Sequence, residues 1–89
     1  MVDLRQLWTL IKADLHRALK LLPDSADQQS VRRYYEFVEH NELELACDAL
    51  EESVKDRPVT GEFWLALLDA ARKMQPAENA TRYEMRAKG

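Results

Sequence analysis

Residues 3–22 read DLRQLWTLIKADLHRALKLL, and this stretch predicts the first helix of the chain. Its apolar residues recur at spacings of three and four, which places them in one stripe on a helix. They are Leu4, Leu7, Trp8, Ile11, Leu15, Ala18, Leu19 and Leu22. Asp3 is a suitable N-cap, and Pro23 cannot continue a helix. A helix with one apolar stripe must bury it, so the remaining segments must cover this face.

Three more stripes with helical spacing follow along the chain. Their inward positions are Val31, Tyr34, Tyr35 and Val38 in the second helix, Leu43, Ala46, Cys47, Leu50 and Val54 in the third, and Phe63, Trp64, Leu67, Leu68, Ala71 and Met74 in the fourth. Ser25 with Gln28, and Asn41 with Glu44, have the spacing of a capping box. Asn41 also tolerates the left-handed conformation that ends a helix. Thr60 is a suitable N-cap for the fourth helix.

These stripes predict an all-α fold, a compact antiparallel bundle of four helices in a single helical domain of residues 1–89. Residues 77–89 are polar and form either a short fifth helix or a frayed tail. A hydrophobic content of 46 % supplies the core of one small domain. The two glycines and three prolines leave long helical stretches uninterrupted.

The sequence also carries expectations about location. A single cysteine, Cys47, excludes an internal disulfide framework and favours a reducing compartment. No apolar run resembles a signal peptide or approaches the roughly 20 residues that span a bilayer. We therefore expect a cytoplasmic protein that does not enter a membrane.

The charge pattern is the strongest functional signal in the chain. Residues 36–52 hold seven acidic side chains and no Lys or Arg: Glu36, Glu39, Glu42, Glu44, Asp48, Glu51 and Glu52. The formal charge of −3 divides into +2 for residues 1–35, −7 for residues 36–52 and +2 for residues 53–89. Concentrated charge opposes folding, and it is useful for steering toward a basic partner.

These acidic side chains are expected to form one face. On a helical wheel Glu44, Asp48 and Glu51 share one flank of the third helix, and Glu52 extends it toward solvent. The acidic residues of the second helix point outward, and the tight joint between the two helices brings both groups together. The alternative is an ordinary solvated surface in which Glu51 forms a weak pair with Lys55.

Two apolar or amphipathic residues are candidate anchors in this face. Leu45 lies opposite the core side of the third helix, between acidic neighbours, and is expected to enter a pocket of the partner. Its alternative is packing under the C-terminal tail or against the first helix. Tyr35 borders the acidic block, and tyrosines bury large areas at interfaces with little loss of entropy. A core position with a hydrated hydroxyl is the alternative for Tyr35.

Signals of catalysis are absent from the sequence. It contains no Gly-rich phosphate loop, no nucleophile elbow and no zinc-protease helix motif. His16 and His40 fall in different segments without a ligand at metal-binding spacing, and Cys47 is expected to be a buried thiol. We therefore expect neither a cofactor nor a metal, and no enzymatic activity. Nucleic-acid binding is disfavoured, because no helix carries a basic stripe and the acidic block would repel phosphate.

Residues 34–46 read YYEFVEHNELELA, followed by Ala49-Leu50, Phe63-Trp64, Ala70-Ala71 and Met74. This pattern, centred on His40-Asn41-Glu42, resembles small helical immunity proteins of bacterial polymorphic toxin and contact-dependent growth inhibition systems, such as the MafI and CdiI groups. The resemblance covers residues 31–74. It implies a protein that binds the C-terminal domain of one cognate toxin in the cytoplasm and blocks it. Many such toxins are nucleases with basic grooves, which an acidic face can fill. Contact residues differ between relatives, so the resemblance assigns none here.

A second class of function competes with this one. A helical adaptor or regulatory module would bind several cellular proteins through the same surfaces, with weaker affinity for each. Tyr83 and Met85 also offer a hydrophobic patch through which the chain could form a homodimer.

Overall fold

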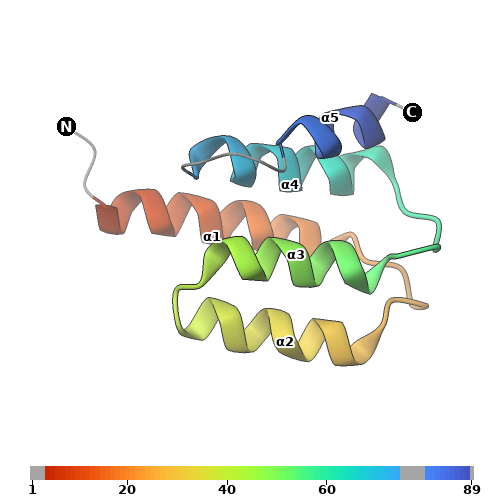
Figure 1. Cartoon of the computed structure of the whole chain (residues 1–89), viewed down its shortest axis with the longest axis horizontal. Helices are drawn as coiled ribbons and strands as arrows, with labels where there is room; N and C mark the ends of the chain where they lie inside the picture. The colour runs from red at the N-terminus through yellow and green to blue at the C-terminus, as the bar shows by residue number, and fades with distance from the viewer. Residues whose placement is uncertain (1–3, 75–79, 89) are drawn as a thin grey trace.

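The computed structural model describes residues 4–74 and 80–88, and every regular element in these residues is a helix. The helices are α1 (Leu4–Lys20), α2 (Gln28–Glu39), α3 (Leu43–Ser53), α4 (Gly61–Lys73) and α5 (Ala80–Lys88) (Figure 1). The expected all-α class and the four expected helices are confirmed. Residues 80–88, expected as a helix or a tail, form a helix.

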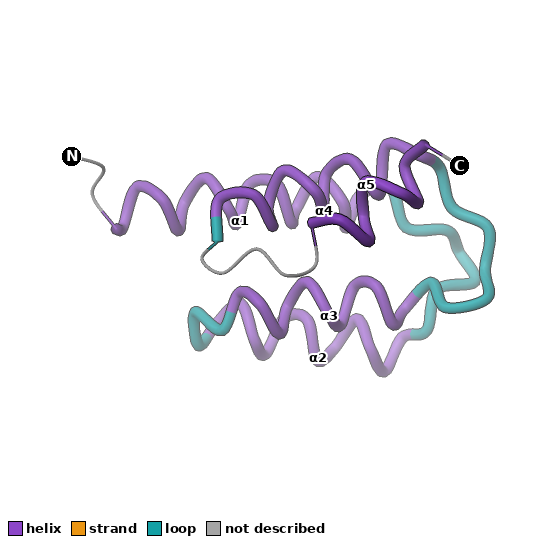
Figure 2. The backbone as a smooth tube through the Cα atoms, turned by 45° about the horizontal axis from the view of Figure 1, so that its top comes forward, coloured by secondary structure: helices purple, strands orange, loops and turns teal. Residues whose placement is uncertain are grey.

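The helices pack in three main pairs, and the two helices of each pair run in opposite directions (Figure 1). α1 lies along α4, α2 along α3, and α5 along α4, while smaller contacts join α3 to α1 and α4. Figure 2 shows the α2–α3 hairpin on one side of the molecule and α1, α4 and α5 on the other. None of the helices in residues 4–74 and 80–88 has both the length and the apolar character needed to span a bilayer.

The core follows the predicted stripes closely. All five inward positions of the third helix are buried, and so are Phe63, Trp64, Leu67, Leu68 and Ala71 of α4. In α2 the prediction holds for Tyr34 and is wrong for Tyr35, which is exposed. Consecutive residues of a helix lie about 100° apart, so two adjacent large side chains cannot both face one neighbour. The buried side chain one turn before Tyr34 is Ser30, which turns the inward face of α2 away from Tyr35.

Two of the predicted helix starts are wrong. The N-cap of α2 is Asp27, not Ser25, and its carboxylate Oδ2 accepts hydrogen bonds from the backbone N–H of Ser30 at 3.1 Å and from the Ser30 hydroxyl at 2.7 Å. The Asp27 amide also donates to the carbonyl of Ser53 at 2.9 Å, which ties the start of α2 to the end of α3. The expected cap Asp3 lies outside the described residues.

The joint between α2 and α3 is tight because Asn41 is left-handed, with φ of 56°. This part of the prediction is confirmed. The capping box with Glu44 is not, because Glu42 occupies the N-cap position of α3 and makes no side-chain cap bond. The Glu42 amide instead donates to the carbonyl of Phe37 at 2.8 Å, which closes the turn. Thr60 stands at the N-cap of α4, as expected, without a side-chain hydrogen bond.

Candidate partner-binding surface

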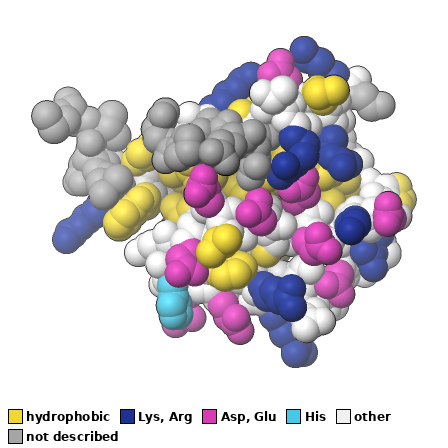
Figure 3. Space-filling view, in the orientation of Figure 1, with side chains coloured by type: hydrophobic (Ala, Val, Ile, Leu, Met, Phe, Trp, Pro, Cys, Tyr) yellow, Lys and Arg dark blue, Asp and Glu magenta, His cyan; other side chains and the backbone are white. Residues whose placement is uncertain are grey.

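The acidic block lies on the α2–α3 hairpin and its side chains are largely exposed. Those of residues 36, 39, 42, 44, 48 and 52 are exposed to solvent. Figure 3 shows acidic side chains gathered over this hairpin, with hydrophobic side chains and some basic ones among them. No Lys or Arg of the described residues lies within ion-pair distance of Glu39, Glu44 or Glu52. We call the exposed acidic residues of this hairpin the acidic face.

Glu51 differs from Glu39, Glu44 and Glu52, because a cation from outside the block pairs with it. Arg82 of α5 donates to both carboxylate oxygens, from Nε to Oε2 at 2.6 Å and from Nη2 to Oε1 at 2.6 Å. This pairing raises the pKa of Arg82 above its ordinary value. The sequence had offered Lys55 as the partner of Glu51, and the structure gives Arg82 instead. Glu51 therefore fastens α5 to α3, and the acidic face ends beside it.

A groove of about 590 Å³ opens next to the acidic face. Among the residues that the structure describes, its lining comes from Leu7, Trp8 and Ile11 of α1, from residues 41–45, and from Lys73 and Met74 at the end of α4. We call this cavity the Leu45 groove, because Leu45 forms its exposed apolar edge. Sequence reasoning placed Leu7, Trp8 and Met74 in the core and missed the groove. The signal was the adjacent pair Leu7-Trp8, which widens the apolar stripe of α1 beyond what one neighbouring helix covers.

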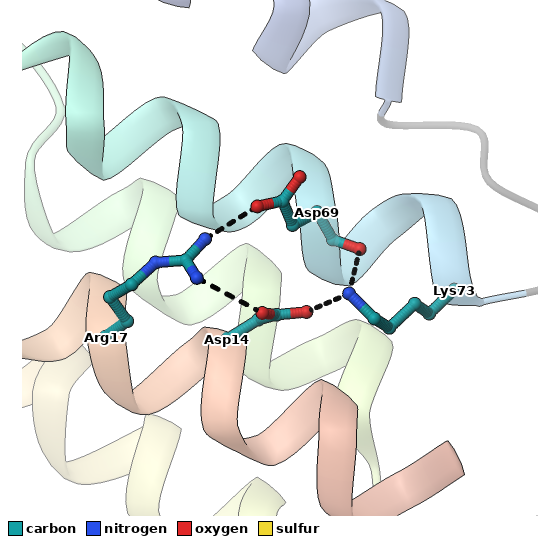
Figure 4. Close-up of polar contacts among 4 residues, drawn as sticks. All are labelled: Asp14, Arg17, Asp69 and Lys73. Carbon is teal, nitrogen blue, oxygen red and sulfur yellow. Dashed lines mark hydrogen bonds and ion pairs between the residues drawn. The ribbon is translucent and has the colours of Figure 1, made fainter.

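The cation that lines the groove is already paired. Lys73 Nζ lies 2.5 Å from Oδ2 of Asp14 on α1, and it also donates to the backbone carbonyl of Asp69 at 3.3 Å. Arg17 completes the cluster, with Nη1 3.5 Å from Asp14 Oδ1 and Nη2 2.7 Å from Asp69 Oδ2 (Figure 4). These four residues link α1 to α4. The groove is therefore bordered by a compensated lysine on one side and by the exposed carboxylates of the α2–α3 joint on the other.

Tyr35, the second candidate anchor, stands apart from the groove. Its ring meets the ring of Tyr34 edge to face, with centroids 5.2 Å apart at 67°. Burial raises the pKa of Tyr34 to about 12. Tyr35 itself is exposed on α2 beside Glu36 and does not line the groove. It remains a candidate contact at the margin of the acidic face.

The remaining candidate groups are Cys47 and the two histidines. Cys47 is fully buried, and this burial, with the nearby carboxylate of Asp48 as a smaller cause, raises the pKa of its thiol to about 12. A thiol with such a pKa stays protonated at neutral pH and is a poor nucleophile. His16 and His40 are exposed on different elements. In residues 4–74 and 80–88, no cluster of His, Cys, Asp or Glu has an arrangement that could hold a metal ion.

No protein-family model matches the chain, and neither a curated protein nor a solved structure matches it. A functional interpretation therefore rests on the acidic face, the Leu45 groove and the resemblance described above.

Proposed function

We propose that this chain is an immunity protein of the cytoplasm that binds one toxin domain and blocks it. The toxin would be a nuclease, and the acidic face would cover its basic substrate groove. The observation that carries the proposal is the exposed charge of the α2–α3 hairpin, where no Lys or Arg of the described residues pairs with Glu39, Glu44 or Glu52. The sequence resemblance supports the same class of protein independently of the charge argument.

The physical basis of inhibition is competition for the same cations. A nuclease holds its substrate through Lys and Arg side chains that contact phosphate. Carboxylates placed at similar positions attract those side chains and, once bound, exclude nucleic acid from the groove. Complementary charge also raises association rates by about 10- to 1,000-fold at low salt, which suits an inhibitor that must act before damage occurs.

A growth-rescue experiment tests the proposal. Cells would express a candidate toxin domain, taken from the C-terminus of any large secreted protein that is found encoded beside this gene, with and without this chain. We expect growth to stop without the chain and to resume with it. Toxicity that persists in the presence of folded chain would refute the immunity function and favour an adaptor.

Two charge-reversal variants then test the acidic face. Glu39→Lys with Glu44→Lys changes two exposed positions of that face, and Asp24→Lys with Glu62→Lys changes two exposed positions elsewhere. Both variants move the formal charge by the same amount, from −3 to +1, because each replacement adds +2. Each also reverses one acidic residue in the first turn of a helix, Glu44 in α3 and Glu62 in α4. Glu51 is left unchanged, since its reversal would also release α5.

We expect the first variant to bind the toxin domain at least about tenfold more weakly and with a flatter dependence on salt. The control should stay within about twofold of the unmodified chain, as expected for charges outside an interface. Equal weakening of both variants would show that net charge matters and that the acidic face does not.

The second candidate function is a helical adaptor, and the Leu45 groove is the observation that favours it. A groove of this size can receive an amphipathic helix, which is a common mode of adaptor binding. An adaptor would bind several partners with micromolar affinity and would fail the rescue experiment.

A further inference from the structure

We infer that the Leu45 groove receives bulky apolar side chains from the partner, on an amphipathic segment that carries Lys or Arg beside them. The identity of this partner as a toxin domain rests on the proposed function. The chemistry of the segment rests on the groove itself. The inference reverses the role expected for Leu45, which forms one edge of a receiving groove instead of entering a pocket of the partner.

The groove has an apolar floor and one exposed apolar edge, formed by Leu45. Ile11 of α1 and Leu43 of α3 line it and are themselves buried, so they form its deepest part. Trp8 and Met74 are partly buried beside them, and Leu45 is 45 % exposed at the edge. The volume of about 590 Å³ falls within the range of about 300–1,000 Å³ that is typical of ligand sites. It is therefore large enough to bury apolar side chains of a partner.

The charges at the edges of the groove determine which residues of that segment can lie beside its apolar side chains. Glu42 and Glu44 line the groove from the α2–α3 joint and are both exposed. The lysine that also lines it, Lys73, is held by the carboxylate of Asp14 at 2.5 Å, so its charge is largely compensated. An incoming segment consequently meets net negative charge. Lys or Arg next to its apolar side chains would pair with Glu42 and Glu44, whereas acidic flanks would be repelled.

The groove and the acidic face are continuous, which gives the interface two physically different parts. Glu42 and Glu44 belong to both, and Leu45 follows them directly. Acidic side chains that stay hydrated accelerate encounter but contribute little to the lifetime of a complex. Apolar side chains buried in a central groove provide that lifetime, since most differences in affinity lie in dissociation rates.

A peptide experiment with the full chain tests the chemistry of the groove without any toxin. The probe is a short helical peptide of Leu and Lys with its leucines on one face, and its counterpart has Glu in place of Lys. We expect the Lys peptide to shift the nuclear magnetic resonance signals of Leu7, Leu45 and the Trp8 indole. The Glu peptide should bind at least about tenfold more weakly. Equal binding of the two peptides, or shifts centred on another surface, would overturn the inference.

Leu45→Ala and Leu65→Ala are matched variants for the same purpose. The two leucines are 45 % and 48 % exposed, both lie in helices, and Leu65 lines a different surface of α1 and α4. We expect Leu45→Ala to weaken binding of both the Lys peptide and the toxin domain about tenfold, mainly through faster dissociation. Leu65→Ala should stay within about twofold, as expected outside the interface. Equal effects of the two variants would contradict a groove-specific role.

The outcomes separate this inference from the proposed function. If the toxin domain does not bind the chain at all, the immunity function fails, and the peptides still decide the chemistry of the groove. If the toxin domain binds through the acidic face but Leu45→Ala binds as tightly as the unmodified chain, the groove inference alone fails. If sedimentation shows a dimer of this chain that Leu45→Ala abolishes, the groove belongs to a second copy, and the inference is again overturned.

Discussion

Replacing Asp14 by alanine should destabilise the bundle more than removal of any exposed carboxylate. The Asp14 side chain is only 10 % exposed, and it holds Lys73 at 2.5 Å and Arg17 at 3.5 Å. Removing one partner of a fully buried ion pair costs about 3–5 kcal/mol, whereas an exposed pair contributes about 0–1 kcal/mol. Lys73 and Arg17 are 32 % and 51 % exposed, so water reaches both cations after the replacement.

The expected loss lies between these limits. Lys73 and Arg17 also keep contacts with Asp69, at its carbonyl and its carboxylate. We therefore expect Asp14→Ala to lower the free energy of unfolding by about 2 kcal/mol, between the buried and exposed cases. For a domain of this size, that loss lowers the melting temperature by roughly 8–16 °C. Urea unfolding followed by far-ultraviolet circular dichroism measures the free energy, and calorimetry measures the temperature.

Glu84→Ala is the matched control for this measurement. Glu84 also contacts two cations, Arg72 at 3.8 Å and Lys88 at 3.2 Å, but its side chain is 43 % exposed. We expect a loss below about 0.5 kcal/mol, as for other exposed pairs. A double-mutant cycle of Asp14→Ala with Lys73→Met should give a coupling of about 1–2 kcal/mol. If Asp14→Ala costs no more than the control, or if the cycle shows no coupling, the cluster does not hold α1 to α4.

Three further outcomes concern two buried side chains, Tyr83 and Cys47, and the N-cap residue Asp27. Tyr83→Phe should raise the free energy of unfolding by about 1 kcal/mol, because the Tyr83 hydroxyl is buried without a hydrogen-bond partner among the described residues. A lower free energy of unfolding in urea would show that the hydroxyl is hydrogen-bonded. Cys47 should resist a thiol reagent at mildly alkaline pH until urea unfolds the chain, since its pKa is about 12, and equal labelling of both states would contradict its burial. Hydrogen bonds from the Ser30 hydroxyl and amide lower the pKa of Asp27 below 3.8. The contribution of Asp27 to stability is therefore complete above pH 3.8 and disappears as the pH falls through its pKa in the folded state. Asp27→Asn should therefore flatten the loss of stability in acid, and identical acid profiles would refute this.

The helices and the core were predictable because burial imposes a local period. Ile11, Leu15 and Ala18 repeat at three and four residues, and only a helix places them on one side. The cap of α2 was mispredicted because Ser25 and Asp27 carry similar local signals. Asp27 has the additional contact with Ser53, which belongs to another helix. A contact between two helices thus determines which residue caps α2, whereas the local sequence did not distinguish the two candidates.

The parts of the candidate site that escaped prediction depend on pairs distant in sequence. Arg82 meets Glu51 across 31 positions, and Lys73 meets Asp14 across 59. No local spacing links such residues, so the sequence offered only the nearby Lys55 as a partner for Glu51. The docking of α5 was equally hidden, because its fully buried side chain, Tyr83, packs against Trp64 of another helix, with ring centroids 6.1 Å apart.

The distribution of cations explains why charge remains on the α2–α3 hairpin. Arg17 and Lys73 are used between α1 and α4, and Arg82 is used between α5 and α3. These pairs join α1 to α4 and α5 to α3, so moving their cations to the hairpin would weaken the bundle. The repulsion within the acidic face is consequently tolerated by a fold that is fastened elsewhere. A partner that brought its own Lys and Arg to this face would relieve the repulsion on binding. The charge that the fold tolerates would then be the charge that the partner recognises.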